Sequence, residues 1–91
     1  MALYNYETMP AGTVVCCFVV VYDFTDARGR SRHYSRYFRT RQMAERYAAD
    51  KARRGYYVRT YKDTTTTIEP EYTDAAGTIH AARLRTVWEA I

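Results

Sequence analysis

Residues Thr13 to Phe24 read TVVCCFVVVYDF, and every residue from Val14 to Tyr22 is apolar, five of those nine being valine. β-Branched and aromatic side chains favour a pleated, packed surface, so this stretch predicts a strand ending at Thr25. Successive side chains of a strand point to opposite faces, so an unbroken apolar run predicts a central strand covered on both faces. Nine residues are too few to cross a bilayer as a helix.

A turn signal follows this strand at Asp26-Ala27-Arg28-Gly29. An Asp at the first position can accept hydrogen bonds from the turn backbone, and a Gly at the fourth can adopt the left-handed conformation of a bulge. A three-residue loop predicts that Asp26 pairs with Arg30 and that a second strand runs from Arg30 to Phe38. The same register places these pairs opposite one another: Phe24 and Arg32, Tyr22 and Tyr34, Val20 and Arg36, Phe18 and Phe38.

A helix is predicted from Arg41 to Arg54. Thr40 is a suitable N-cap, and Gly55 is a natural residue just beyond the C-terminal end. Ion-pair spacings of four residues mark the outer face. The apolar residues recur on one helical face, which we expect to lie close on the sheet because alanine predominates there; they are Met43, Ala44, Tyr47, Ala48 and Ala52.

The remaining segments give weaker signals. Tyr56 to Lys62 reads as a third strand, whereas Thr64 to Thr67 has strand propensity but no apolar residue to bury, which predicts an exposed edge strand or a loop. Pro70 argues against a central position there. Near the N-terminus, Met1 to Gly12 has Tyr4 and Tyr6 at strand spacing, which indicates a short edge strand or an ordered arm.

The C-terminal segment allows two interpretations. Thr73 to Gly77 repeats the pattern of Thr25 to Gly29, which predicts a second hairpin with the same turn. Against this, Leu84, Val87, Trp88 and Ile91 have helical spacing. We favour a strand over a helix for residues 79–91. The predicted fold is therefore α+β: a single domain of residues 1–91 with an antiparallel sheet of four to five strands and one principal helix on one face.

Neither cofactor nor catalytic chemistry is indicated. Cys16 and Cys17 are adjacent in the predicted strand, so they point to opposite faces and read as reduced, buried thiols, which fits a cytoplasmic protein. His33 and His80 lie far apart without the clustered ligands that zinc requires. The N-terminus lacks the pattern of a signal peptide, and no membrane partner is expected. We expect a non-enzymatic protein with no cofactor and no bound metal.

Charge is distributed unevenly along the chain. Residues 28–62 carry twelve Lys and Arg against Glu45 and Asp50, a balance of +10, while residues 63–77 carry −4. Arg predominates in this region and alternates with Tyr. The Arg guanidinium can form bidentate hydrogen bonds with phosphate or carboxylate, and it can also stack on aromatic rings. An alternative is that the Tyr side chains face the helix as part of the core, while the Arg side chains lie on a solvated face with no binding role. The predicted partner-binding residues are Arg28, Arg30, Arg32, Tyr34, Arg36, Tyr37, Arg41, Tyr57 and Arg59.

Two kinds of partner fit this surface. The first is a protein or nucleoprotein machine that the chain occludes, with binding hot spots at Tyr34, Arg36, Tyr37 and Tyr57. The acidic segment 63–77 favours this version, because mixed patches can meet complementary patches on a protein. The second is nucleic acid, with Arg28, Arg30, Arg32 and Arg41 on phosphates and Tyr37 or Tyr57 stacking on bases. Homodimerisation through an exposed sheet edge is a further alternative.

Two resemblances accompany these expectations. The order of hairpin, helix and strand resembles that of arm-type DNA-binding domains, which set a three-stranded sheet on one helix. In general character the chain resembles small phage-encoded accessory proteins, including inhibitors of bacterial CRISPR defence, which share a single compact α+β domain, no catalytic set and an unusual surface. That resemblance implies an inhibitor acting in the host cytoplasm. No motif carries either resemblance, so no residue role is transferred.

Overall fold

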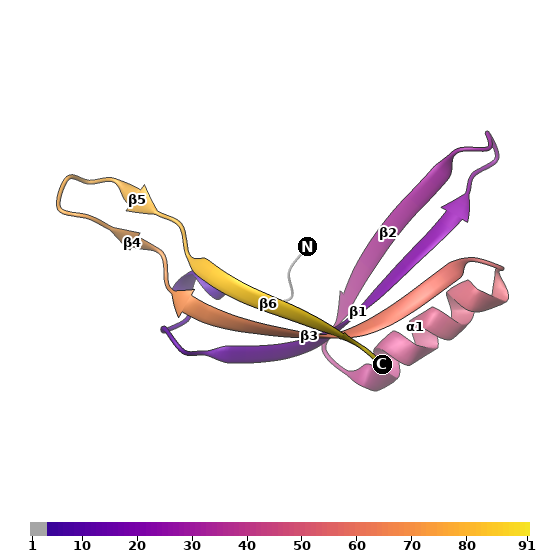
Figure 1. Cartoon of the computed structure of the whole chain (residues 1–91), viewed down its shortest axis with the longest axis horizontal. Helices are drawn as coiled ribbons and strands as arrows, with labels where there is room; N and C mark the ends of the chain where they lie inside the picture. Colours follow the sequence, from indigo (N-terminus) through magenta and orange to yellow (C-terminus); the bar gives the residue numbers. More distant parts are fainter. Residues whose placement is uncertain (1–3) are drawn as a thin grey trace.

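The computed structural model describes residues 4–91, except for the side chain of Glu7, and has an α+β fold (Figure 1). Four strands form an antiparallel sheet in the order β2-β1-β3-β6, and β4 and β5 form a separate hairpin. This arrangement confirms the predicted fold class. In chain order the elements are η1 (Tyr6–Thr8), β1 (Val14–Thr25), β2 (Ser31–Phe38), α1 (Arg41–Arg53), β3 (Tyr57–Glu69), β4 (Tyr72–Thr73), β5 (Ile79–His80) and β6 (Arg83–Ala90).

Strand β1 is central, as predicted. Its neighbours Val19 and Val20 point to opposite faces, and both are 0% exposed. The prediction of two covered faces is wrong for the first residues, since Val14 is 57% exposed. The β1–β2 register is the predicted one, with Tyr22 opposite Tyr34 and Val20 opposite Arg36.

Helix α1 packs on one face of β1, β2 and β3. Thr40 accepts a hydrogen bond from the backbone N–H of Met43, and Gly55 has the positive φ of +84° that ends the helix. Ala44 is fully buried among Val20 and Phe38, which confirms the predicted close approach of an alanine-rich face. Met43 departs from the prediction: it is 54% exposed, because it lies at the margin of that contact.

Strand β3 continues well beyond the predicted Lys62. The interpretation of Thr64 to Thr67 as an exposed edge or loop is wrong, because β3 lies between β1 and β6. Thr65 and Thr67 are 3% and 1% exposed. Burial of a hydroxyl is tolerated when it is hydrogen-bonded, and Thr65 donates to the Asp63 carboxylate at 2.6 Å. A polar run can therefore occupy an interior strand.

The C-terminal segment is extended, which confirms the second hairpin and excludes the helical alternative. β4 pairs with β5, and β6 then pairs with β3 with an irregularity between Thr67 and Glu69. At the other end, the predicted edge strand is wrong for the described residues, where Tyr6–Thr8 form a 3-10 turn. The first three positions of that predicted segment lie outside the described residues.

The molecule is elongated rather than compact. Its principal extents are 53 × 30 × 16 Å and its radius of gyration is 16.8 Å, against about 12 Å for a compact domain of this length. Figure 1 shows a wide V, with the β1–β2 hairpin forming one arm, the β4–β5 hairpin ending the other, and α1 outside the first arm. One half of the sheet therefore lacks a helical layer. No helix in the described part of the chain is long and apolar enough to cross a membrane.

Candidate binding surfaces

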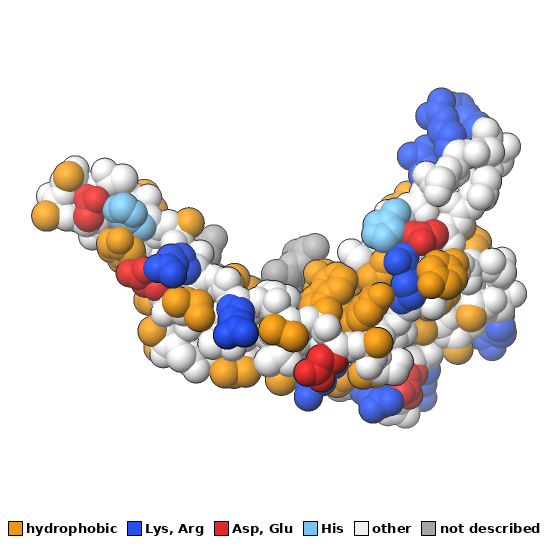
Figure 2. Space-filling model, in the orientation of Figure 1, with side chains coloured by type: hydrophobic (Ala, Val, Ile, Leu, Met, Phe, Trp, Pro, Cys, Tyr) orange, Lys and Arg blue, Asp and Glu red, His pale blue; other side chains and the backbone are white. Residues whose placement is uncertain are grey.

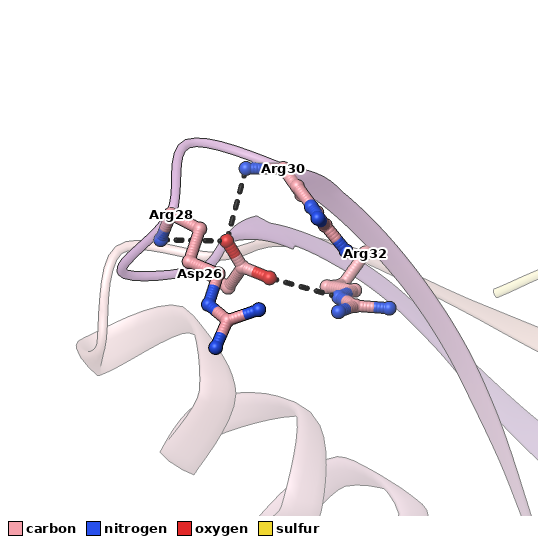
Figure 3. Close-up of polar contacts among 4 residues, drawn as sticks. All are labelled: Asp26, Arg28, Arg30 and Arg32. Atoms are coloured by element: carbon pink, nitrogen blue, oxygen red, sulfur yellow. Dashed lines mark hydrogen bonds and ion pairs between the residues drawn. The ribbon is translucent and has the colours of Figure 1, made fainter.

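The tip of the β1–β2 hairpin is organised by one carboxylate (Figure 3). Asp26 Oδ1 accepts hydrogen bonds from the backbone N–H groups of Arg28 and Arg30, each at 2.9 Å, and Oδ2 accepts one from Arg32 Nε at 3.0 Å. Gly29 supplies the required positive φ of +77°. The Arg30 backbone hydrogen bond, supported by Arg32 and Arg28, holds the pKa of Asp26 below its ordinary 3.8. The turn is thus a well-defined platform for three arginines.

Asp26 leaves two of those three arginines without a counter-ion. Only Arg32 forms an ion pair with it, and within residues 4–91 the guanidinium groups of Arg28 and Arg30 form none. Figure 2 shows Lys and Arg side chains gathered at the free end of this hairpin. We call residues 26–36 the basic arm. Its tip holds a net charge of +2, from three arginines and one aspartate.

Further along the basic arm, Arg and Tyr alternate on the helix side of β2. Tyr34 stacks on Tyr22 and Phe24, with ring centroids 5.7 Å away in each case, and remains 48% exposed. The Arg36 guanidinium lies 5.2 Å from the Tyr47 ring centroid. The sheet therefore does not separate a Tyr side from an Arg side. At these positions Arg and Tyr share the helix side of β2, so the division of the alternative into a Tyr side and an Arg side is not present there.

Three of the predicted binding residues lie on the opposite face, so the predicted single surface is wrong. Tyr37 is one position out of phase with Tyr34 and Arg36, and the alternation of a strand sends it to the helix-free face. Tyr57 and Arg59 lie on that face too. Arg59 is engaged there, since its Nη2 donates to Asp23 Oδ2 at 2.7 Å and its guanidinium covers the Tyr57 ring at 4.9 Å.

Arg41 does not join the arginines of the tip. It follows the other end of β2, and an eight-residue strand separates the two sites by roughly 26 Å. Its Nε donates to Glu45 Oε1 at 2.8 Å, one helical turn on. Of the four arginines predicted to contact phosphates, Arg28, Arg30 and Arg32 therefore lie together at the tip. Arg41 is paired on the helix surface instead.

Sequence reasoning missed a polar network on the helix-free face. Asp63 is 4% exposed and accepts hydrogen bonds from Trp88 Nε1 at 2.7 Å and from the Thr65 hydroxyl at 2.6 Å. The Trp88 ring stacks on Tyr61 at 5.4 Å and meets Tyr37 edge-on at 6.5 Å. Tyr37, Tyr61 and Trp88 form what we call the aromatic cluster. Burial raises the pKa of Tyr37, which keeps its hydroxyl protonated.

The acidic segment does not form an acidic patch. Asp63 is buried, Glu69 lies 3.6 Å from Arg83, and Asp74 Oδ2 lies 2.8 Å from His80 Nε2. These carboxylates serve the fold and leave Glu71 as the segment's one remaining acid. Three of the four acidic side chains that favoured a protein partner are therefore buried or paired within the chain.

The second hairpin repeats the turn of the first. Asp74 Oδ1 accepts hydrogen bonds from the backbone N–H groups of Ala76 and Thr78, each at 2.9 Å, and Gly77 has a φ of +82°. The sixth residue on is His80, where the first turn has Arg32. The His80 side chain is the main reason that the pKa of Asp74 lies below its ordinary 3.8.

A prediction follows for the acid response of this turn. Because folding lowers the pKa of Asp74, its contribution to stability is present above pH 3.8 and is lost as the pH falls through the folded value. We expect His80→Ala to raise the pKa of Asp74 and to leave that of Asp26 unchanged, since an amide of the turn dominates there. Carboxyl titration by NMR measures both, with Asp26 as internal control. An unchanged Asp74 pKa in the variant would contradict the assignment.

Two kinds of reactive group can be checked in the described residues: metal-binding clusters and a thiolate. No group of three or more His, Cys, Asp or Glu side chains within residues 4–91 is arranged to hold a metal ion. Burial raises the pKa of the Cys17 thiol to about 11, so it is not a thiolate at neutral pH. Searches against protein-family models, curated proteins and solved structures find no match to the chain.

Proposed function

We propose that this chain is a non-enzymatic binding protein whose basic arm contacts the phosphates of a nucleic acid. The observation that carries the proposal is the pair Arg28 and Arg30, whose guanidinium groups have no ion-pair partner within the described residues and whose backbone N–H groups Asp26 binds at the free end of a two-stranded ribbon. Phosphate neutralisation supplies most of the affinity in such contacts, and Arg is well suited to it.

The shape of the arm supports this choice of partner. An antiparallel two-stranded ribbon fits the major groove of duplex DNA, and strands are an established means of groove binding. Tyr34 and Arg36 lie on one strand face behind the tip, where they can follow the backbone or stack on exposed bases. Since most carboxylates of segment 63–77 are buried or paired within the fold, that segment gives no reason to prefer a protein target.

The test is fluorescence anisotropy with labelled duplex DNA, single-stranded DNA and RNA at about 50 and 200 mM salt. We expect Arg28→Ala/Arg30→Ala to weaken binding about tenfold and to reduce the salt slope by about two, one for each phosphate that is no longer neutralised. The matched control is Arg53→Ala/Arg54→Ala, which removes the same charge from arginines that pair with Asp50 on α1.

Comparing the two double variants distinguishes specific phosphate contacts at the basic arm from attraction by the net charge of the protein. If both double variants weaken binding equally, the arm has no special role and net charge alone explains the affinity. If the wild-type protein shows no binding to any of the three nucleic acids at low salt, the nucleic-acid proposal is wrong.

The second candidate is occlusion of a protein or nucleoprotein machine, in the manner of a phage-type inhibitor. The observation that favours it is the helix-free face, where Tyr57 is 64% exposed and Trp88 is 42% exposed. Exposed Tyr, Trp and Arg are the residues that most often dominate protein–protein binding. Under this candidate Tyr57→Ala weakens capture of the target, whereas Arg28→Ala/Arg30→Ala leaves it within about twofold.

A further inference from the structure

Strand β6 pairs with β3 on one side and has no neighbouring strand on the other within residues 4–91. All eight of its residues are exposed; it contains neither proline nor lysine, and its charges are of both signs, Arg83 and Arg85 against Glu89. The backbone N–H of Ile91 donates to the Thr60 carbonyl. Because these groups alternate along an antiparallel strand, the odd-numbered residues bond to β3 and the even-numbered ones face outward. Within the described residues, the backbone donors and acceptors of Leu84, Thr86 and Trp88 therefore point outward without a strand partner.

The sequence of this edge is complementary to itself. When two copies of β6 run antiparallel with Thr86 on the two-fold axis, Leu84 of one copy lies opposite Trp88 of the other. In the same register Arg83 lies opposite Glu89. Glu89 has no ion pair within the described residues, and Arg83 makes only the 3.6 Å contact with Glu69. The apolar pair, the hydroxyl pair and the charge pair match in this alignment, while Arg85 lies opposite Val87.

The exposed area of this elongated chain is sufficient for an interface with a partner. Its accessible surface is 6523 Å², whereas a compact monomer of 10.7 kDa is expected to expose about 5,500 Å². The excess of about 1,000 Å² is comparable to the roughly 800 Å² that each partner of a standard interface buries. Several large apolar side chains near β6 contribute to it, each between 42% and 45% exposed: Leu84, Val87, Trp88, Ile68 and Ile91.

The other edge of the sheet is protected against the same association. Strand β2 carries Arg32, His33 and Arg36 within eight residues, with no carboxylate. Two copies of β2 would bring like charges together, which disfavours pairing. The β2 edge therefore disfavours pairing with a second copy of itself, whereas the mixed charges of β6 do not.

We propose that two copies of this chain pair through β6 about a two-fold axis at Thr86, which joins their sheets into one continuous eight-stranded sheet. Three backbone pairs would form across the axis, Leu84 with Trp88 twice and Thr86 with Thr86, which adds about six hydrogen bonds. The interface is isologous, so it closes at the dimer. The basic arm lies at the opposite edge of each sheet, so the dimer presents two arms.

The first measurement is molar mass in solution by light scattering over a wide range of concentration. We expect about 21 kDa, twice the mass of the 10.7 kDa chain. A mass that stays at the monomer value at every concentration would overturn the proposal. The measurement uses no nucleic acid, so its outcome is independent of the function proposed above.

Two sets of variants locate the interface. Thr86→Pro removes an outward-facing N–H and the hydroxyl contact with Thr65, but spares the backbone hydrogen bonds to β3, so we expect a folded monomer. Ser35→Pro makes the same change at an outward-facing position of β2 and should leave the dimer intact. Circular dichroism verifies folding. A dimer that survives Thr86→Pro, or is lost equally in Ser35→Pro, would assign the interface elsewhere.

A charge exchange tests the register even if the proline variant fails to fold. Glu89→Arg places like charges opposite Arg83 twice in the dimer and should weaken association about tenfold. The double variant Arg83→Glu/Glu89→Arg restores opposite charges and should recover most of the affinity. Failure of the double variant to recover would show that Thr86 does not lie on the axis.

Discussion

Replacing Asp63 by alanine is expected to lower the free energy of unfolding by about 2 to 3 kcal/mol. The carboxylate is 4% exposed and accepts hydrogen bonds from Trp88 Nε1 and the Thr65 hydroxyl. Without it, Trp88 Nε1 loses its partner, and the Thr65 hydroxyl keeps only the Thr86 hydroxyl at 3.0 Å. Relief of the carboxylate's own desolvation offsets part of this cost. In a domain of this size the loss is a large fraction of the total stability.

Urea unfolding followed by circular dichroism measures the effect of Asp63→Ala. Trp88 is the sole tryptophan of the chain, so its fluorescence reports on this site in the same titration. The control is Asp50→Ala, which removes a carboxylate that pairs with exposed Arg53 and Arg54 and should cost under about 1 kcal/mol. Equal losses in the two variants would show that the buried network contributes nothing special.

Val20→Ala is expected to destabilise the protein by about 2 to 3 kcal/mol. The side chain is 0% exposed and packs with Phe38 and Ala44 at the sheet–helix contact. Its truncation removes apolar contact and leaves a cavity that the close-packed helix cannot fill.

The same strand provides a matched control for that change. Val14→Ala makes the identical substitution at a position that is 57% exposed, where we expect a cost below about 1 kcal/mol. Thermal or urea unfolding compares the two. Similar values would mean that the contact between α1 and the sheet does not stabilise this fold as its burial implies.

Local signals were sufficient to predict the first hairpin and the helix. Asp26 and Gly29 define the turn by their own chemistry, and the two-residue period then determines each facing pair of β1 and β2. Thr40 and Gly55 likewise mark the helix ends within one residue. These features depend on neighbours in sequence, so no knowledge of the remaining fold was needed.

Features that depend on strand neighbours could not be predicted in this way. Thr65 and Thr67 are buried because β1 and β6 flank β3, and a threonine run by itself gives no sign of that. The contact of Trp88 with Asp63 depends on the β3–β6 register and on the irregularity near Thr67. In the candidate site, Tyr37 and Arg36 are neighbours on one strand and must therefore point to opposite faces. Their separation could have been predicted from the sequence alone.

The sequence separations of the paired strands indicate the order in which the sheet assembles. β1 and β2 meet through a short turn, whereas β1 and β3 pair residues as distant as Val14 and Thr66. Closing a longer loop costs more chain entropy, so we expect the first hairpin and α1 to form before β3 docks. β3 and β6 close a shorter loop than β1 and β3, since Glu69 pairs with Arg83, so we expect them to pair as a second hairpin before β3 docks on β1. The edge that would receive a second copy can therefore form before the sheet is complete, so self-association does not have to wait for the native chain.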